Sequence, residues 1–219
     1  GNKKNWITFV GKLNKAKGYD IFGKAVTKVL NKYKHWSALI VGDEKREDIK
    51  FIQKNLKKLG FLKHQKVLDI FKKTSIAVVC SRWEEPFGRT SLEAAANGCA
   101  VIITNKGGLP ETITNGIILK RLNSKDLEKT IENLIKNKNK RKRIQKLSLE
   151  NFYLTNEYVS KIIDDYRDLK LLTQSYYIRK KENRPLRILH ITNFNERLDG
   201  RLFFNTGRRI NNGFIRLGH

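Results

Sequence analysis

WEEPFGRTSLEAAANG, residues 83–98, lies between two apolar stretches, residues 75–80 and 100–104. Pro86 and Gly88 indicate a turn, and Thr90 with Glu93 three residues later forms a capping box, which is typical of a helix start. We expect this helix to begin at Thr90 and to end at Gly98. The segment is therefore predicted as strand, tight loop, helix and strand, with the loop at the carboxyl end of a buried strand.

In open parallel sheets, ligands bind at this rim. The first amides of the predicted helix, residues 89–92, would offer hydrogen-bond donors to an anion such as phosphate. Glu85 and Glu93 bracket the loop, and a carboxylate beside an anion is favourable where it accepts hydrogen bonds from sugar hydroxyls. Two simpler interpretations stay open: Glu93 pairs only with Thr90, and Glu85 is only a solvated loop charge.

The two glutamates, with Phe87-Gly88 after the first and residues 94–98 after the second, resemble the signature of retaining glycosyltransferases of the family-4 type. Further segments at predicted strand ends resemble that family in the same order along the chain: residues 9–13 with 17–18, residues 40–43 and residues 104–111. The resemblance covers residues 5–175. It implies the GT-B fold, in which two Rossmann-like domains face each other across a cleft, and this chain would be the carboxyl-terminal, donor-binding half.

The resemblance also implies roles for individual residues. Lys12 and Lys17, with the amides of residues 88–91, would hold the donor diphosphate as leaving group. Arg is more usual than Lys at the first of these positions. Lys12 therefore offers a single ammonium group in place of a guanidinium that could make two parallel hydrogen bonds to the phosphate. Glu93 would accept from the ribose hydroxyls, and Glu85 would contact the donor sugar without being assigned as a nucleophile. The predicted substrate contacts are completed by Gly11, Phe87, Gly88, Arg89, Thr90 and Ser91.

Residues 61–63, His64 and Glu111 are interpreted as supporting residues rather than as part of the diphosphate and sugar site. By the resemblance, residues 61–63 lie in a loop that presents its backbone to the nucleotide base. His64 follows this loop and is interpreted as a helix-start residue rather than a catalyst. Glu111, one residue after Pro110, is interpreted as a first-turn acid favoured by the helix dipole.

Apolar runs alternate between strand and helix spacing along most of the chain. Strands are expected at residues 6–11, 37–42, 59–62, 75–80, 100–104 and 116–119. Helices are expected at residues 19–34, 46–56, 65–73, 90–98, 123–135 and 151–172, with a solvated, very basic helix-turn-helix over residues 136–146. This order predicts an α/β fold with a Rossmann-like parallel sheet flanked by helices.

The chain is expected to contain three parts. Residues 1–178 would form the donor-binding domain, and residues 179–185 a polar linker. Residues 186–219 resemble the start of the amino-terminal domain of another glycosyltransferase module. The chain opens at Gly1 and contains no Met, so we expect an excised piece of a longer protein with tandem modules.

The net charge of the chain limits the classes of partner that it is expected to bind. Lys and Arg total 46 against 21 Asp and Glu, a formal charge of +25. Such a balance is typical of proteins that bind nucleic acid, an anionic membrane surface or phosphorylated ligands, and a lysine-rich coding bias explains it equally well. No aromatic residues interleave the basic stretches, and no known nucleic-acid-binding module is present. A membrane surface is favoured over nucleic acid, because the resemblance implies a lipid-linked or surface-glycan acceptor. No apolar run is long enough for a membrane span. Cys80 and Cys99 are expected to be buried thiols in a reducing compartment, and no metal-ligand cluster is present.

The resemblance implies a retaining, metal-independent glycosyltransferase domain of the hexosyltransferase type, acting in polysaccharide biosynthesis. The donor would be a UDP- or GDP-sugar without a further cofactor, and the acceptor a glycan or a lipid-linked glycan. The missing amino-terminal domain would be a partner, so the fragment is expected to be inactive alone. A cytoplasmic location is expected, and a peripheral position at the inner membrane surface is left open. Two alternatives remain: a non-catalytic nucleotide-sugar-binding scaffold and a basic nucleic-acid-binding domain.

Overall fold

The computed structural model of the chain describes residues 3–173 and 212–216, the side chains of residues 170–173 excepted. The chain divides into two compact units, Gly1–Ile163 and Asp164–His219. The predicted linker at residues 179–185 lies outside the described residues. Of the predicted second module at residues 186–219, only residues 212–216 are described, and they are helical. The predicted boundaries of the three parts therefore stay predictions.

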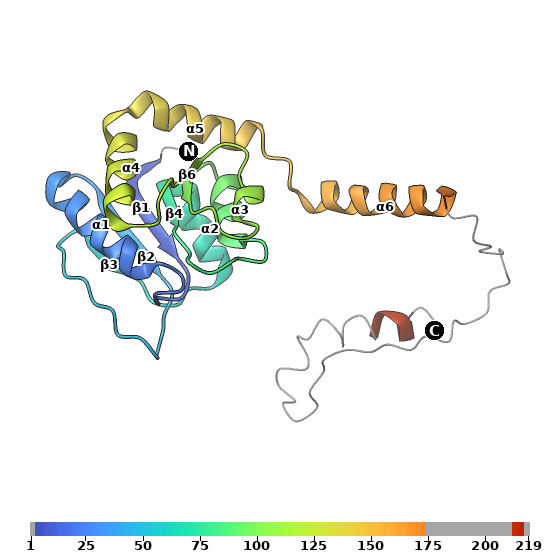
Figure 1. The fold of residues 1–219 in the computed structure, drawn as a ribbon, viewed down its shortest axis with the longest axis horizontal. Coiled ribbons are helices and arrows are strands. Elements are labelled where there is room, and N and C mark those ends of the chain that lie inside the picture. The colour runs from blue at the N-terminus through green and yellow to red at the C-terminus, as the bar shows by residue number, and fades with distance from the viewer. Residues whose placement is uncertain (1–2, 174–211, 217–219) are drawn as a thin grey trace. The chain divides into compact units, whose positions relative to one another are not determined.

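The first unit is built on a parallel sheet of six strands in the order β3-β2-β1-β4-β5-β6 (Figure 1). The strands are β1 (Lys4–Val10), β2 (Ser37–Val41), β3 (Leu56–Lys58), β4 (Thr74–Val79), β5 (Ala100–Ile103) and β6 (Ile117–Ile118). The strand order reverses direction between β1 and β4, which pair in parallel. This confirms the predicted α/β class with a Rossmann-like parallel sheet, in which ligands bind at such a switch point.

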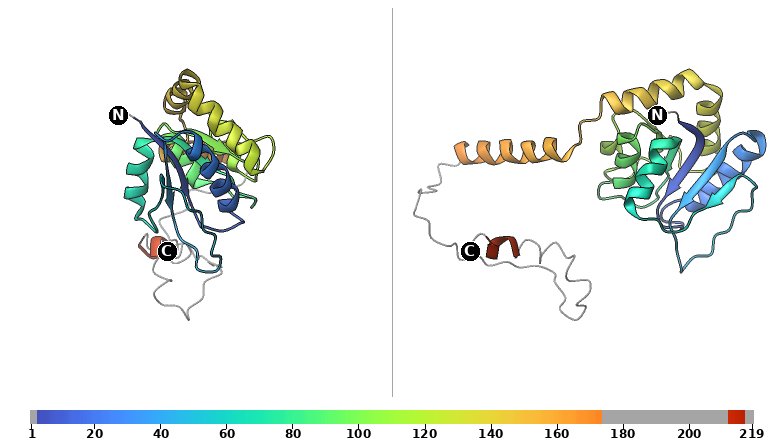
Figure 2. Two further views of the ribbon diagram at one scale, coloured as in Figure 1. Left: turned by 90° about the vertical axis from the view of Figure 1, so that its left-hand side faces the viewer. Right: turned by 180° about the vertical axis from the view of Figure 1, so that it is seen from behind.

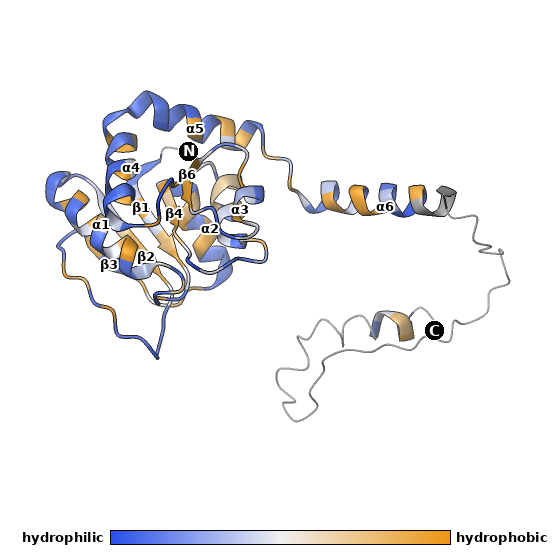
Figure 3. Ribbon diagram, in the orientation of Figure 1, coloured by the Kyte–Doolittle hydropathy of each residue, from blue (hydrophilic) through white to orange (hydrophobic). Residues whose placement is uncertain are grey.

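Helices cover both faces of the sheet. The helical elements are α1 (Tyr19–Lys32), α2 (His64–Lys73), α3 (Arg89–Ala96), the 3₁₀ helix η1 (Leu109–Thr112), α4 (Ser124–Lys136), α5 (Lys138–Glu150) and α6 (Asn156–Thr173). The left view of Figure 2 shows α2, in teal, on one side of the sheet and α1 and α4, in blue and yellow-green, on the other. The strands lie between them as the apolar layer, with hydrophilic residues on the outer sides of the helices (Figure 3).

The four central strands contribute residues to two separate cores, because successive side chains in a strand point to opposite faces. Ile76 and Val78 of β4 belong to the core beneath α1 and α4, whereas Ala77 belongs to the core beneath α2 and α3. The same alternation places Ile102 of β5 in the first core and Ile103 in the second. Both faces are therefore buried, which explains the almost continuous apolar runs in the sequence.

The predicted helix at residues 46–56 is wrong. Residues 45–55 form an irregular connection, and the third strand is Leu56–Lys58 rather than residues 59–62. The apolar residues here follow a period of two: Ile49 and Phe51 pack against the core, and Ile52 is 96% exposed. The Phe51 ring meets that of Tyr19 edge-on at 5.5 Å, so packing on α1 holds the segment in an extended path.

The predicted capping box of Thr90 and Glu93 is also wrong. The helix α3 begins one residue earlier, at Arg89, and its N-cap is Gly88 in the left-handed region, with no side-chain cap. The αL backbone at Gly88 already starts the helix, so the Thr90 hydroxyl has no N-cap position to fill.

A buried arginine joins α4 to the basic helix α5. Arg141 Nη1 donates to the carbonyls of Leu134 and Ile135, at 2.5 and 3.2 Å, in the last turn of α4. Its guanidinium lies 4.9 Å from the centroid of the Trp36 ring. The orphan carbonyls of the α4 end are thereby satisfied by a cation, which also complements the helix dipole.

Candidate functional site

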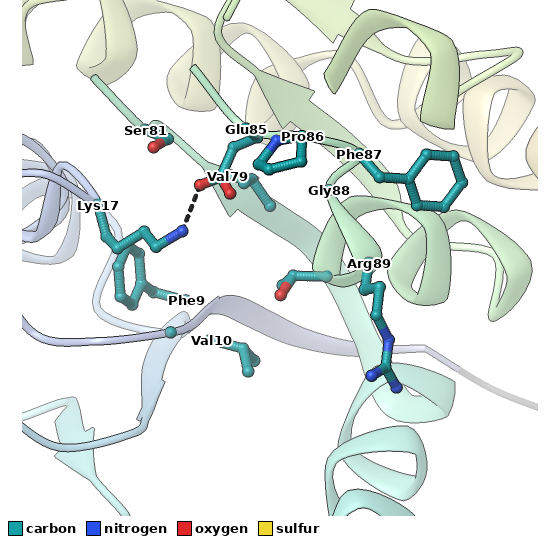
Figure 4. Close-up of a pocket in the computed structure, with 12 residues that line it drawn as sticks. Phe9, Val10, Lys17, Val79, Ser81, Glu85, Pro86, Phe87, Gly88 and Arg89 are labelled. Carbon is teal, nitrogen blue, oxygen red and sulfur yellow. Dashed lines mark hydrogen bonds and ion pairs between the residues drawn. The ribbon is translucent and has the colours of Figure 1, made fainter. Parts of the chain in front are cut away.

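A pocket of about 370 Å³ lies where β1 and β4 end, at the switch point of the sheet. Its floor is made by the strand ends, and its walls by two loops that follow β1 and β4. The lining residues are Phe9, Val10, Gly11, Lys17, Val79, Ser81, Glu85, Pro86, Phe87, Gly88, Arg89 and Thr90 (Figure 4). Of the residues expected to contact substrate from sequence, Gly11, Lys17, Glu85 and residues 87–90 line this one pocket.

Lys17 and Glu85 point toward each other across the pocket (Figure 4). Lys17 Nζ donates to Glu85 Oε1 at 2.5 Å, and the two side chains are 32% and 12% exposed. These residues are 68 positions apart and come from different loops, so the fold brings a cation and a carboxylate together at one end of the pocket. The Phe87 ring points away from this pair (Figure 4).

The two loops are tied to each other by the carbonyl of Ala16. This oxygen accepts from Ser81 Oγ at 3.2 Å, from the Arg82 amide at 2.8 Å and from the Trp83 amide at 3.2 Å. The Arg82 side chain also pairs with Asp20 in the first turn of α1, at 2.6 and 2.7 Å. This pairing holds the pKa of the Asp20 carboxyl below its usual value of 3.8. The loops that carry Lys17 and Glu85 are thus fastened directly behind the pocket.

Glu84, next to Glu85 in sequence, has a different task. Its carboxylate accepts from Lys106 Nζ and from the Gly107 amide, both at 2.6 Å. The Lys106 ammonium, helped by that amide, lowers the pKa of Glu84. Glu84 therefore anchors the loop to the segment after β5, and Glu85 is the residue that faces the pocket.

The amino end of α3 forms the far wall of the pocket. Because no side chain caps this end, the first amides of the helix are available to an anion. Gly88 has φ +102°, and a Cβ there would lie 2.6 Å from Leu109 Cδ2. The Ser91 hydroxyl is turned away from the pocket and contacts the Gly88 carbonyl at 2.7 Å and Thr112 Oγ1 at 2.6 Å. Ser91 therefore offers a ligand only its amide.

A second pocket, of about 260 Å³, adjoins the first and shares Val10 and Gly11 with it. It is lined by Val10, Gly11, Lys12, Val41, Gly42, Asp43, Phe61, Leu62 and Val67. Lys12, expected beside Lys17, lies in this second pocket. Most of the residues that line the second pocket are apolar, in contrast to the charged end of the first pocket.

Glu93 lines neither pocket. Its Oε1 contacts His64 Nε2 at 3.0 Å and Arg89 Nη2 at 3.2 Å. The sequence interpretation of His64 as a simple helix-start residue missed this contact. His64 is the first residue of α2, and only the packing of α2 beside α3 brings it to Glu93, 29 positions away. No local sequence pattern reports such a contact.

Cys80, at the end of β4, is not a candidate nucleophile. It is a free, fully buried cysteine whose Sγ contacts the Gly18 carbonyl at 3.2 Å. Burial raises the pKa of this thiol to about 12, which keeps it protonated. Within residues 3–173 and 212–216, no group of three or more His, Cys, Asp or Glu side chains could hold a metal ion. Over the same residues, no helix is both long and apolar enough to cross a bilayer.

A family model covers more than half of the chain, and several curated proteins are similar to it. A family model described as glycosyl transferases group 1 matches residues 1–149. Spore coat protein SA of Bacillus subtilis is 29% identical over 162 residues, which is 66% of this chain and 43% of that protein. The chain spans less than half the length of the curated relatives it matches first.

Solved structures carry the same fold. The C-terminal domain of the group 1 family glycosyl transferase LpcC from Francisella tularensis superposes with a TM-score of 0.61 and 27% identity, covering 68% of this chain and 84% of that one. Anabaena HepE in complex with UDP-glucose gives a TM-score of 0.60 at 20% identity, covering 75% of this chain and 49% of that one. The second likeness shows the fold alone.

Proposed function

The chain belongs to the glycosyl transferases group 1 family, and from this premise we propose that its first unit binds a nucleotide-diphosphate sugar. Together with an amino-terminal domain, it transfers the sugar with retention to a glycan or lipid-linked acceptor. The observation that carries the proposal is the Lys17–Glu85 pair, at 2.5 Å, in a pocket that also contains the uncapped start of α3.

The diphosphate is assigned to the amides at the start of α3 and to Lys17. Both are donors that carry positive charge or partial charge, and both lie in the same pocket. Their attraction for the diphosphate grows as the bond to the sugar breaks, so they stabilise the leaving group. Lys12, which lines the adjoining pocket, is assigned to the same anion.

Glu85 is assigned to the hydroxyls of the donor sugar. When the diphosphate takes Lys17 as its counter-ion, the Glu85 carboxylate loses its partner and needs new donors. Sugar hydroxyls supply them, whereas an apolar group would leave a largely buried charge unpaired. Glu85 acts here as an acceptor, and we assign no nucleophile.

The second pocket is assigned to the nucleotide base. Phe61, Leu62 and Val67 give it the apolar walls that suit a flat aromatic ring, and it continues directly from the first pocket. The UDP-glucose complex of HepE supports a nucleotide-sugar ligand for this fold. The base, the sugar, the acceptor, metal independence, a role in polysaccharide biosynthesis and a cytoplasmic location stay predictions.

Calorimetry with UDP- and GDP-sugars tests the donor site. We expect saturable binding of at least one of them, and Lys17→Met weakens it about 10-fold, because one hydrogen bond between charged groups is lost. Lys15→Met is the matched control: Lys15 is an exposed lysine of the same loop, and its recorded contacts are made by its backbone. Equal affinity of both variants, or no binding of any donor by the wild-type chain, would contradict the proposal.

Two alternative functions are distinguished from this proposal by different experiments. A non-catalytic scaffold binds the donor in the same way, and only turnover in the intact parent protein distinguishes it from an enzyme. A nucleic-acid-binding domain instead binds random-sequence DNA or RNA at moderate salt, and it does so equally well in Lys17→Met.

A further inference from the structure

The carboxylate of Glu93 is held through one oxygen. His64 Nε2, at 3.0 Å, and Arg89 Nη2, at 3.2 Å, both contact Oε1. No hydrogen bond to Oε2 is recorded among residues 3–173. The Glu93 side chain is 20% exposed, so solvent or a ligand can reach it.

Both contacts come from parts of the fold that are fixed in place. Arg89 is one turn before Glu93 on α3, and His64 is the first residue of α2, which packs against α3. The loop before His64 is pinned to the end of β2 by backbone hydrogen bonds from Leu59 to Ile40 and from Gly42 to Gly60, both at 2.8 Å. His64 is thus a positioned donor, although its side chain is 59% exposed.

This cluster adjoins residues of both pockets. Arg89 lines the first pocket, and Leu62, two residues before His64, lines the second. A ligand with its phosphates at the start of α3 and its base against Phe61 has its pentose between the two. In the proposed site, this places the pentose beside the cluster that holds Glu93.

We propose that His64 is a positioning residue for nucleoside recognition. It donates its Nε2–H to Oε1 of Glu93 and so presents Oε2 to the pentose hydroxyls of the donor. Either the neutral tautomer with a proton on Nε2 or the imidazolium can make this bond. The inference rests on the proposed nucleotide-sugar function and adds to it a residue that makes binding depend on the pentose hydroxyls.

The test measures discrimination between two ligands rather than affinity alone. Calorimetry compares UDP, or GDP if that is the nucleotide bound, with the 2′,3′-dideoxy form of the same diphosphate. The wild-type chain is expected to prefer the hydroxylated form by about 10-fold or more, the effect of a hydrogen bond to a charged acceptor. Glu93→Ala is expected to bring this ratio close to 1.

His64→Ala is expected to lower the ratio several-fold, and His64→Gln, which keeps a donor near the Nε2 position, to retain most of it. His35→Ala is the matched control, because His35 is an exposed histidine in the connection that precedes β2, at the other end of the sheet. Unfolding midpoints equal to that of the wild type show that the fold is kept.

The outcomes separate the two proposals. An unchanged ratio in His64→Ala, with a large ratio in the wild type, overturns the role of His64 and leaves the donor site standing. A wild-type ratio near 1 overturns the pentose role of Glu93 and with it that of His64. Absence of any nucleotide binding overturns both proposals together.

Discussion

Replacement of Gly18 by alanine is expected to destabilise the protein far more than the same replacement at Gly60. Both glycines have almost the same left-handed backbone, with φ +73° and +68°. Their surroundings differ: a Cβ at Gly18 would lie 1.9 Å from the Cys80 carbonyl oxygen, whereas nothing lies within 4 Å of a Cβ at Gly60. The comparison therefore separates the cost of the backbone conformation from the cost of the clash.

The magnitude follows from these two terms. A left-handed alanine costs about 1–2 kcal/mol, and this is the whole expected effect of Gly60→Ala. Gly18→Ala carries the same cost and must also move the end of β4, because β-carbon contacts shorter than 3.0 Å essentially never occur. Forced displacement of packed atoms adds roughly 1–3 kcal/mol. Gly18→Ala should therefore lower the free energy of unfolding by about 2–5 kcal/mol.

Urea denaturation followed by circular dichroism measures the difference. With a slope of about 2 kcal/mol per molar urea, the two midpoints should differ by roughly 0.5–1.5 M, with Gly18→Ala lower. Equal midpoints would refute the reasoning, since they would mean that the β1–α1 loop moves away from Cys80 at no cost.

Three further outcomes are expected. Asp20→Asn should lower the free energy of unfolding by about 1 kcal/mol at pH 7. Because Arg82 lowers the pKa of Asp20 in the folded state, the difference from the wild type should persist above pH 3.8 and disappear as the pH falls through that lowered pKa. Unfolding curves measured from pH 7 to pH 3 would show this. Arg141→Met should cost about 2 kcal/mol in a thermal or urea melt, since two carbonyls at the end of α4 lose their donor and the contact with Trp36 weakens. The affinity for vesicles containing anionic lipid, measured by co-sedimentation, should fall by up to about three orders of magnitude when four exposed basic residues of α5 are changed to Gln. It should fall much less when four exposed lysines elsewhere are changed. The α5 set is Lys138, Lys142, Arg143 and Lys146, and the control set is Lys45, Lys54, Lys57 and Lys58.

Most of the sheet could be predicted from sequence because its strands are buried on both faces. Residues 75–80 and 100–104 read as continuous apolar runs, and β4 and β5 lie within one residue of them. The segment at residues 45–55 misled the prediction because Ile49, Ile52 and Leu56 have helical spacing. Packing of Phe51 on α1, which is a tertiary contact, decides its path instead.

The candidate site was predictable where residues belong to one loop, and less so where the contact joins distant elements. The loop at residues 85–90 lines one pocket with Lys17, as the resemblance implied. Spacing alone paired Glu93 with Thr90, but the structure pairs it with His64 and Arg89. The pair with Arg89 is a local contact between residues four positions apart, whereas the contact with His64 depends on the packing of α2 beside α3, and that information is absent from a local window.

The carbonyl of Ala16 has a consequence for motion. Three donors converge on this single oxygen, and all three belong to the loop after β4. The turn after β1 and the loop after β4 consequently form one mechanical unit rather than two hinged flaps. A ligand that pulls on either segment displaces both, and a change at Arg82, which does not line the pocket, alters the position of Lys17.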